Sequence, residues 1–418
     1  MSPRSLPYPV FDIDNHMYET TDALTKYLPK QHRGKVGYVE VNGRPKLVVK
    51  DHISHMIPNP TFERVARPGS AEDYFLGNNP EGLNFREFVG EPMNVIPAFQ
   101  APAPRLELMD ELGIDQCVMY PTLASLIEER TTDDVVLTHA IIHALNEWMH
   151  EHWTFNYQDR IFATPVICLP LVDEAIKEFR WCLERGMKTF LVRPAPVPSR
   201  FGGSRSMGLP EFDPFWQEVV DAGIPVTFHA ADSGYQKHLM EWEGGDEYLS
   251  FKPSALREVV MGFRAMEDTL AALICHGALS RFPDLKVLVV ENGSGWVRNL
   301  LRLLDKAYRT MPKEFDEHPV EVFKRNVYIH PFLEDDIKGI IEIMGEDHVM
   351  FGSDFPHPSI VGTPCPAAAA GFAPSRYRSL PREPSDRGSA RAHRGRSGRP
   401  GCPPSPGSPS PPRAARWA

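Results

Sequence analysis

The stretch Val10-Phe11-Asp12-Ile13-Asp14-Asn15-His16 is an apolar run that ends in two carboxylates and an imidazole. Successive side chains of a strand point to opposite faces, so Asp12, Asp14 and His16 share one face. Three later apolar runs have the same design and end in His229, Glu291 and Asp354. Runs of this kind, each ending in a group that binds a metal or carries a proton, predict one shared site at the strand ends.

The chain around these runs alternates strand patterns with helical patterns. The strand patterns cover residues 9–14, 115–120, 161–168, 188–193, 224–229, 286–291, 326–330 and 348–353. The helical patterns cover residues 132–153, 172–185, 211–222, 256–280, 296–310 and 333–344. This alternation predicts an α/β fold, a (β/α)8 TIM barrel whose active site lies where the strands end.

Two regions fall outside the alternating pattern. Residues 20–100 are predicted to be an insertion after strand one, with a hairpin around Asn42-Gly43. Residues 361–418 are rich in Pro, Arg, Ser and Gly and predict a disordered tail after a barrel domain of residues 1–360. The composition changes so abruptly that we interpret this tail as a replaced, non-native C-terminus. An ordinary disordered basic tail and a nucleic-acid-binding tail are the alternatives.

Composition limits the class of protein and its partners. The 418 residues are 42% hydrophobic and 24% charged, with a net charge of −10, which argues against nucleic acid as the main partner. That charge divides into about −18 before the tail and +8 within it. No membrane-spanning run or secretory signal is evident, and Cys117 and Cys168 lie in apolar runs typical of reduced core thiols. We therefore expect a cytoplasmic protein, no membrane partner and a small-molecule substrate, with a homodimer as an open alternative.

The strand-end groups have the chemistry of a divalent metal site. A site made of imidazoles and carboxylates suits Zn²⁺, Mn²⁺ or Fe²⁺ better than a site made of thiolates would. Each residue alone has a simpler interpretation: His229 as a structural histidine, Asp14 as a loop cap and Glu291 as a buried ion-pair partner. Their joint occurrence at predicted strands one, five, six and eight favours the metal site.

Three motifs resemble those of a known family: Phe11-Asp12-Ile13-Asp14-Asn15-His16, the linker 280–287 that leads to Glu291-Asn292-Gly293, and Phe351-Gly352-Ser353-Asp354-Phe355-Pro356-His357. Over residues 8 to about 360, the chain resembles the amidohydrolase-related group of the metal-dependent hydrolase superfamily. Its motifs are most similar to the aminocarboxymuconate-semialdehyde decarboxylase branch. The resemblance implies one divalent metal ion, Zn²⁺ or Mn²⁺, held by Asp14, His16, His229 and Asp354.

Two positions depart from the family pattern. Asp14 stands where the family usually has the first histidine of an H-x-H motif, and this harder ligand favours Mn²⁺ over Zn²⁺. Glu291 stands where the decarboxylases usually carry a histidine near the substrate, which weakens the decarboxylase interpretation.

The resemblance narrowly favours a non-oxidative decarboxylase (carboxy-lyase) of a small, aromatic carboxylic acid. Asp354 would protonate the ring carbon, Arg193 would orient the acid, and Glu291 would position the substrate. The first alternative is a metal-dependent hydrolase of an amide, ester or lactone, in which Asp354 takes a proton from water. The second alternative is a non-productive barrel that lacks its last helix.

The remaining candidates are weighed against structural roles. His357 is predicted to orient Asp354, and His330 is equally consistent with a pocket-facing and a structural role. Arg193 is equally consistent with a substrate clamp and a rim salt bridge. His276, His139 and His143 are interpreted as structural or solvated.

Overall fold

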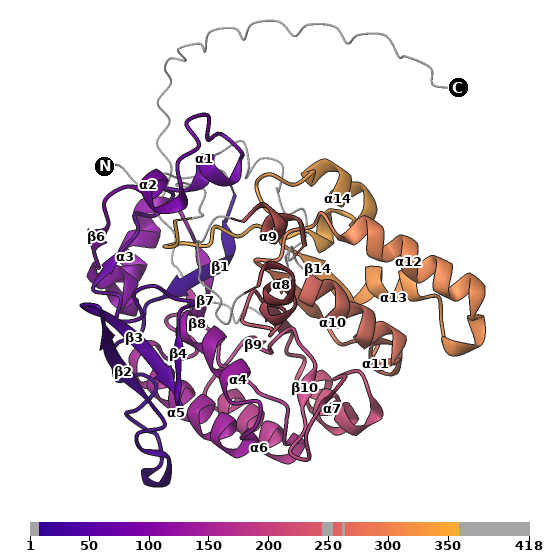
Figure 1. Ribbon diagram of the computed structural model, residues 1–418. Coiled ribbons are helices and arrows are strands. Elements are labelled where there is room, and N and C mark those ends of the chain that lie inside the picture. Colours follow the sequence, from indigo (N-terminus) through magenta and orange to yellow (C-terminus); the bar gives the residue numbers. More distant parts are fainter. Residues whose placement is uncertain (1–7, 245–253, 261–263, 359–418) are drawn as a thin grey trace, which may run out of the picture. The chain divides into compact units, whose positions relative to one another are not determined.

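Strands and helices alternate along the chain and form an α/β fold with parallel sheets (Figure 1). The structure is a computed structural model that describes residues 8–244, 254–260 and 264–358. The predicted tail at residues 361–418 lies outside the described residues, so its interpretation stays a prediction. The division into a barrel domain and a tail likewise stays a prediction.

The strands are β1 (Phe11–Met17), β2 (Val36–Val41), β3 (Arg44–Val49), β4 (His52–Ser54), β5 (Arg64–Val65), β6 (Met93–Asn94), β7 (Gln116–Pro121), β8 (Ile161–Ala163), β9 (Phe190–Leu191), β10 (Val197–Pro198), β11 (Ser204–Arg205), β12 (Val226–His229), β13 (Val287–Val290) and β14 (Val327–Ile329). The α-helices are α1 (Glu72–Phe75), α2 (Phe85–Val89), α3 (Pro102–Leu112), α4 (Ile127–Arg130), α5 (Val135–Trp153), α6 (Val172–Leu183), α7 (Asp213–Ala222), α8 (Gln236–Glu243), α9 (Ala255–Val260), α10 (Arg264–Cys275), α11 (Ala278–Arg281), α12 (Val297–Thr310), α13 (Pro319–Asn326) and α14 (Ile337–Met344).

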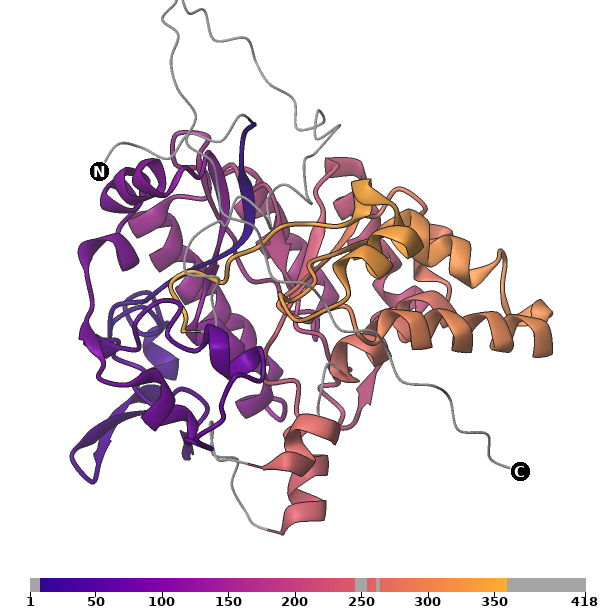
Figure 2. The same cartoon turned by 90° about the horizontal axis from the view of Figure 1, so that it is seen from above.

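Two parallel sheets carry the strands that end in candidate site residues. One sheet has the order β1-β7-β8 and the other has the order β14-β13-β12-β9. Single parallel bridges continue the pairing beyond these sheets, from Val166 to Leu191, from Ile329 to Val349 and from Asn15 to Phe355. The chain after β14 therefore runs beside β1, and Figure 2 shows these two segments near each other.

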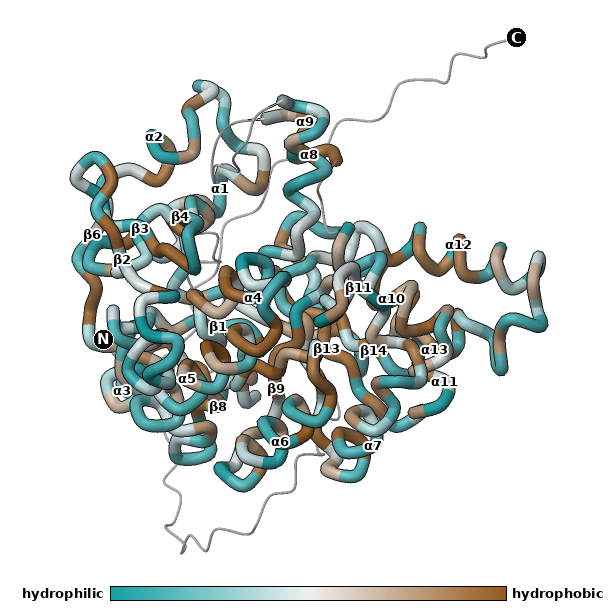
Figure 3. The backbone as a smooth tube through the Cα atoms, turned by 60° about the horizontal axis from the view of Figure 1, so that its bottom comes forward, coloured by the Kyte–Doolittle hydropathy of each residue, from teal (hydrophilic) through white to brown (hydrophobic). Residues whose placement is uncertain are grey.

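Hydrophobic strands lie inside a layer of amphipathic helices. Figure 3 shows β9 and β13 as hydrophobic segments among more hydrophilic helices and loops. The helix α5 follows an N-cap, where the Asp134 side chain accepts a hydrogen bond from the Leu137 amide at 3.1 Å. It buries Trp148 and Trp153 completely. This packing fixes the strands, and with them the residues at their ends.

The insertion after β1 contains an antiparallel pair, β2 and β3, joined at Asn42-Gly43. Both turn residues have positive φ values, 52° and 73°, as a tight hairpin turn requires. A third strand, β4, pairs with β3 and was not predicted.

Several sequence predictions need correction. Residues 348–353 do not form a regular strand, because only Val349 and Phe355 make bridges and Asp354 has a left-handed backbone, which interrupts a ladder. The predicted helix at 256–280 is divided, and Gly277 at φ 79° separates α10 from α11. The helices α3 and α13 were missed, since prolines in their first turns resembled loop signals.

Cys117 and Cys168 are free, buried thiols, as predicted. Within the described residues, no helix has the length and apolar character needed to cross a bilayer.

Candidate metal centre

Strand register brings the chemical groups of distant segments to one place. His229 pairs with Val290, so Glu291 follows directly beside it at the end of β13. On the other side of the site, the His16 amide donates to the Phe355 carbonyl at 2.7 Å. This bond lies next to Asp354 in the chain. The ends of β1, β12 and β13 and the segment around 354 therefore meet.

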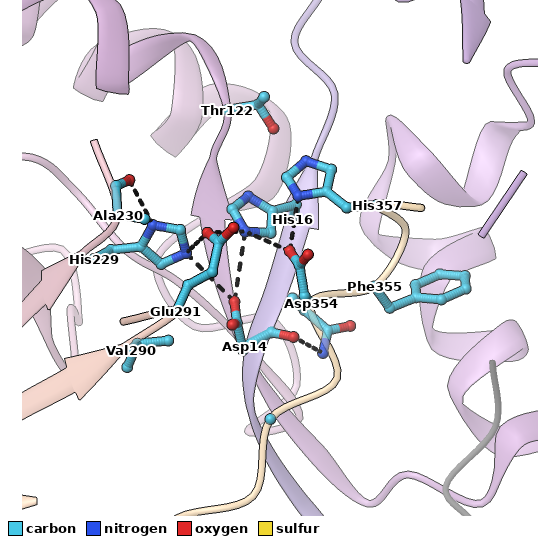
Figure 4. A network of polar contacts seen from close by, with 12 residues as sticks. Asp14, His16, Thr122, His229, Ala230, Val290, Glu291, Asp354, Phe355 and His357 are labelled. Carbon is cyan, nitrogen blue, oxygen red and sulfur yellow. Dashed lines mark hydrogen bonds and ion pairs between the residues drawn. The ribbon is translucent and has the colours of Figure 1, made fainter. Parts of the chain in front are cut away.

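The side chains at these ends point toward one another (Figure 4). His16 Nε2 lies 3.5 Å from Asp14 Oδ1 and 3.3 Å from Asp354 Oδ1. His229 Nε2 lies 3.4 Å from Asp14 Oδ1 and 3.1 Å from Glu291 Oε2. His16 Nε2 is also 4.0 Å from Glu291 Oε2. These distances bring together all five strand-end groups singled out in the sequence.

Among the described residues, two sets have ligand atoms close enough to share one ion. Asp14, His16 and His229 form the first set, and His16, Asp354 and His357 form the second. Each set has all of its ligand atoms within 4.8 Å of one another. His16 belongs to both and links the two sides of the centre.

Two acids of the centre have unusual backbone conformations. Glu291 has φ 52° and Asp354 has φ 59°, both in the left-handed region. Such conformations cost about 1–3 kcal/mol for residues other than glycine and concentrate at functional sites. In these conformations both carboxylates reach an imidazole, Glu291 that of His229 and Asp354 that of His16.

The acids are buried together, so their charges perturb one another. Burial and the nearby charge of Asp354 raise the pKa of Glu291 well above its usual range, although 26% of its side chain stays exposed to solvent. Burial opposes ionisation of Asp14, but contacts with His16, His229 and His330 hold its pKa well below the usual value. Burial opposes ionisation of Asp354 as well, but its contacts with His357 and His16 lower its pKa to about 2.

The pKa of His16 is shifted in the opposite direction to the pKa values of Asp14 and Asp354. Burial disfavours its charged form, yet Asp14 and Asp354 raise its pKa to about 9. Its two ring nitrogens and Asp14 Oδ2 are buried and make no hydrogen bond within the described structure. Buried polar atoms normally have such partners. A divalent cation beside His16 Nε2 and Asp14 Oδ2 would satisfy these two atoms and neutralise the crowded acids, so the residues fit a metal.

Neighbouring groups fix the imidazoles and carboxylates in place. His229 Nδ1 lies 2.9 Å from the Ala230 carbonyl oxygen; donation to that oxygen leaves the Nε2 lone pair directed at the centre. His357 Nδ1 lies 2.7 Å from Asp354 Oδ1, in the orienting position predicted for it. His330 Nδ1 lies 3.4 Å from Asp14 Oδ2, so this histidine faces the centre.

Gly352 allows the last segment to approach β1. A Cβ atom at this position would lie 2.6 Å from the Asp14 Cβ and 2.7 Å from the His330 Cε1. Both distances are far below ordinary contact. Only glycine therefore permits Asp14 and His330 to pack against this backbone.

Arg105, on α3, supports the centre and was missed in the sequence. Its side chain is 1% exposed and donates to the Ala98 carbonyl at 2.6 Å, Asn15 Oδ1 at 3.0 Å and the His16 carbonyl at 2.8 Å. Its guanidinium also lies 4.9 Å from the centre of the Phe355 ring. The arginine thereby connects both segments that meet at the centre.

Glu19 and Asp12 are further buried acids near β1. Glu19 Oε1 accepts from the Leu123 amide at 2.7 Å, and burial raises the pKa of this carboxyl to about 8. Asp12 Oδ1 accepts from the amides of Asp14 and Ser353, at 3.1 and 2.9 Å, and burial raises its pKa to about 6. The pairing of β1 with β7 shifts register between Asp12 and Asn15, which interrupts the alternation that predicted a shared face for Asp12, Asp14 and His16. Nothing in the sequence pattern singled out Glu19.

Arg193 lies after β9, beside the centre but not in it. Its Nη1 pairs with Glu129 Oε2 at 2.9 Å and donates to the Asp232 carbonyl at 3.3 Å. Arg193 and His229 both line a small cavity of about 30 Å³ that is open to solvent. The predicted rim salt bridge is thus present, and the same side chain also reaches the cavity beside His229.

The other histidines lie away from the centre. His143 Nδ1 pairs with Glu178 at 2.7 Å, and His139 Nε2 accepts from the Leu171 amide at 3.2 Å. His276 is exposed. His139 and His143, expected on a solvated face, are thus partly buried and have partners, and His276, expected to be structural, is exposed.

Comparisons with known proteins assign the fold and the site to a family. The family model described as amidohydrolase matches residues 94–370. The chain belongs to the amidohydrolase family. It is an enzyme of the amidohydrolase superfamily, which confirms the resemblance found in the sequence motifs. The family match begins after β1, so Asp14 and His16 lie outside it.

Individual proteins are also similar to this chain. The solved structure of an amidohydrolase from Mycobacterium avium subsp. paratuberculosis K-10 is 37% identical, with a TM-score of 0.83, over 89% of this chain and 96% of that one. The gamma-resorcylate decarboxylase of Rhodococcus jostii (strain RHA1) is 23% identical over 269 residues, which are 61% of this chain and 77% of that protein. The Metarhizium anisopliae enzyme IDCase is 15% identical, with a TM-score of 0.51 over 83% of this chain and 84% of that one, and shares the fold.

Proposed function

We propose that Asp14, His16, His229 and Asp354 bind one divalent metal ion. The buried Nε2 of His16 and Oδ2 of Asp14 carry this proposal, because neither has a hydrogen-bond partner within the described structure. The carboxylates of Asp14, Glu291 and Asp354 and the imidazoles of His16 and His229 lie around these atoms. This oxygen-rich set suits Mn²⁺, with Zn²⁺ as the alternative.

The parallel pairings support a closed (β/α)8 barrel as the frame of this centre. The two sheets supply seven strands, and the bridges at Val166, Val349 and Phe355 continue the pairing between them. The segment 349–355 would then take the place of the eighth strand. In this arrangement residues 1–360 form one domain, and all proposed ligands stand at the carboxyl ends of strands.

We propose that the enzyme is a non-oxidative decarboxylase of a small aromatic carboxylic acid. When bound, the metal ion supplies Lewis acidity that neutralises negative charge on a substrate oxygen. The hydrogen-bonded Asp354–His357 pair holds the proton that the ring carbon receives. As that C–H bond forms, the bond to the carboxyl carbon breaks and carbon dioxide leaves. The likeness to the gamma-resorcylate decarboxylase supports this reaction.

Arg193 would orient the substrate carboxylate. Within the described residues only its Nη1 has a partner, so the other guanidinium nitrogens are available to a ligand in the cavity. Charge-assisted hydrogen bonds from arginine to a carboxylate are strong and directional. Glu291 lies 3.1 Å from His229 and is partly exposed. It would position the substrate from the side opposite Arg193.

Glu291 also supports the alternative, hydrolysis of an ester, amide or lactone. Decarboxylases of the resembled branch usually carry a histidine here, whereas a carboxyl group with a raised pKa can hold a proton for a leaving group. In that reaction Asp354, with its low pKa, accepts a proton from the attacking water.

Product analysis separates the two reactions. Metal-loaded protein is incubated with aromatic acids labelled with ¹³C in the carboxyl group, and with aromatic esters and lactones. Release of ¹³CO₂ from at least one acid, lost in Asp354→Asn, is the expected result. New acid from esters or lactones without any ¹³CO₂ would replace the proposal with hydrolysis.

A further inference from the structure

Three buried polar atoms around the end of β1 have no partner. They are Nδ1 of His16, Oε2 of Glu19 and the hydroxyl oxygen of Tyr38, and none of them makes a hydrogen bond within the described residues. Buried polar atoms normally make such a bond, so each of the three requires an explanation. A metal ion at Nε2 of His16 leaves Nδ1 as an N–H donor, because a ligating imidazole binds the ion through one nitrogen and donates through the other.

Glu19 follows the end of β1, close to His16. Its side chain is completely buried, and Oε1 accepts from the Leu123 amide at 2.7 Å. Burial raises the pKa of Glu19 to about 8, and the Leu123 amide and the charge of His16 oppose this rise. The carboxyl group and the imidazole therefore interact through space, although no direct hydrogen bond joins them in the described structure.

The loop after β7 places this carboxyl group on the Nδ1 side of His16. His16 Nε2 faces Asp14, at 3.5 Å from Oδ1, and Figure 4 shows Thr122 on the opposite side of the ring. Thr122 is anchored beside β1, since its hydroxyl donates to the Met17 carbonyl at 2.9 Å. Leu123 is the next residue and holds the carboxyl group, which therefore lies on the side of Nδ1.

Tyr38, on β2 of the insertion, supplies the third atom. Burial and then the charge of Glu19 raise the pKa of its hydroxyl group, so the two side chains are close to each other without a direct bond. Polar groups that interact beyond hydrogen-bond distance are commonly bridged by water, and a buried water makes about three hydrogen bonds. One N–H donor, one carboxyl oxygen and one hydroxyl group match the donors and acceptors of a single water molecule.

We propose that one buried water accepts a hydrogen bond from His16 Nδ1 and donates to Glu19 Oε2 and to the Tyr38 hydroxyl oxygen, so that Glu19 is a positioning residue for the metal ligand. The proposal rests on the proposed function, since His16 is one of the proposed ligands. The bridged carboxyl group fixes the tautomer and the orientation of the imidazole and directs the Nε2 lone pair at the ion. Through Tyr38, the insertion also contributes to a centre that is built on the parallel strands.

A high-resolution crystal structure of the metal-loaded wild-type protein tests the water directly. One ordered water should lie within about 2.5–3.2 Å of all three atoms. A structure without this water, or one in which His16 Nδ1 bonds directly to another group such as the Thr122 carbonyl, would overturn the proposal.

Competition with a chelator measures what the bridge contributes to Mn²⁺ binding. Glu19→Met should raise the Kd for Mn²⁺ about 10- to 100-fold, as the loss of a group that orients a ligating histidine predicts. Tyr38→Phe should raise it about 2- to 10-fold, as the loss of one neutral hydrogen bond predicts. An unchanged Kd in folded Glu19→Met would overturn the proposal.

Matched controls change the same residue types away from the centre. Glu147→Met removes a glutamate of α5 that pairs with His143, and Tyr27→Phe removes a hydroxyl group that donates to Glu151 at 2.9 Å on the surface. Both should keep the Kd within about twofold of the wild-type value, as surface substitutions usually do. Thermal unfolding checks that each variant is folded. If Glu19→Met does not fold, Tyr38→Phe and the wild-type crystal structure decide.

A readout confined to the imidazole separates positioning from general stability. In Zn²⁺-loaded protein labelled with ¹⁵N-histidine, the Nδ1–H signal of His16 is identified by its absence from His16→Gln. It should shift in folded Glu19→Met and keep its position in the Glu147→Met control. An unmoved signal in Glu19→Met would overturn the proposal.

The same experiments distinguish this proposal from the metal centre itself. Wild-type protein that binds Mn²⁺ through His16, with an equal Kd in Glu19→Met, would keep the centre and remove the bridge. The bridging water in crystals of protein that binds no metal would keep the hydrogen bonds of Glu19 and remove the centre.

Discussion

Replacing Arg105 with methionine tests how the fold holds the metal centre. The guanidinium is buried and donates three hydrogen bonds, to the Ala98 carbonyl, Asn15 Oδ1 and the His16 carbonyl. Methionine has a similar length but no donor, so Arg105→Met leaves three buried oxygen atoms without these bonds.

The expected loss follows from those three atoms. Each buried acceptor left without a partner costs about 1–3 kcal/mol. Removing a buried charge from the core returns part of this cost. The free energy of unfolding should therefore fall by about 3–5 kcal/mol, the lower part of the summed cost of three unpaired acceptors. A domain of ordinary stability would lose a large share of its 5–15 kcal/mol.

Urea denaturation followed by tryptophan fluorescence measures this loss. The matched control is Arg180→Met, which removes an arginine whose side chain is 59% exposed and which pairs with Glu218 on the surface. Exposed pairs contribute about 0–1 kcal/mol, so the control should stay close to the wild type. Arg105→Met should also lower metal content, because His16 loses its backbone anchor. Equal stability of the two variants would refute the reasoning.

Three further changes probe the neighbourhood of the centre. Glu19 has its pKa raised by burial to about 8, against about 4.3 in an unfolded chain, so its contribution to stability is complete below about pH 4.3 and lost as pH rises through 8. Urea titrations at pH 5 and pH 8.5 should therefore show a smaller fall in stability for Glu19→Gln than for the wild type. Gly352→Ala places a Cβ 2.6 Å from the Asp14 Cβ. Thermal unfolding should show a loss of about 1–3 kcal/mol, and the metal content should fall. Wild-type stability together with wild-type metal content would contradict the packing argument. Arg193→Met should raise the KM for a carboxylate substrate roughly 10- to 100-fold with a smaller change in kcat, whereas an unchanged KM would leave Arg193 as a rim salt bridge only.

The strand ends were predictable because burial and chemistry coincide there. The runs before His16, His229 and Glu291 are apolar enough to be buried strands, and parallel strands end at one edge. In the structure β12 and β13 pair so that His229 lies beside Val290 and next to Glu291. The centre thus needed only the pattern and the topology.

The contacts that hold the centre were not predictable in the same way. Arg105 follows Pro102-Ala103-Pro104, which resembles a loop, and a lone arginine in sequence usually indicates a surface charge. Glu19 follows β1 with no spacing that marks it as buried. Both roles depend on where distant backbone carbonyls and amides lie, which only the folded chain determines. The left-handed backbone at Asp354 likewise ends a strand pattern that the apolar residues alone favoured.

The central claim is that Asp14, His16, His229 and Asp354 together bind one divalent cation. Anomalous diffraction at the manganese and zinc edges, from crystals of protein loaded with each metal, tests it most directly. The account predicts a single peak per chain, within coordinating distance of the carboxylate oxygens and imidazole nitrogens of these four residues. A loaded crystal with no peak there, or with its peak at other side chains, would contradict the account.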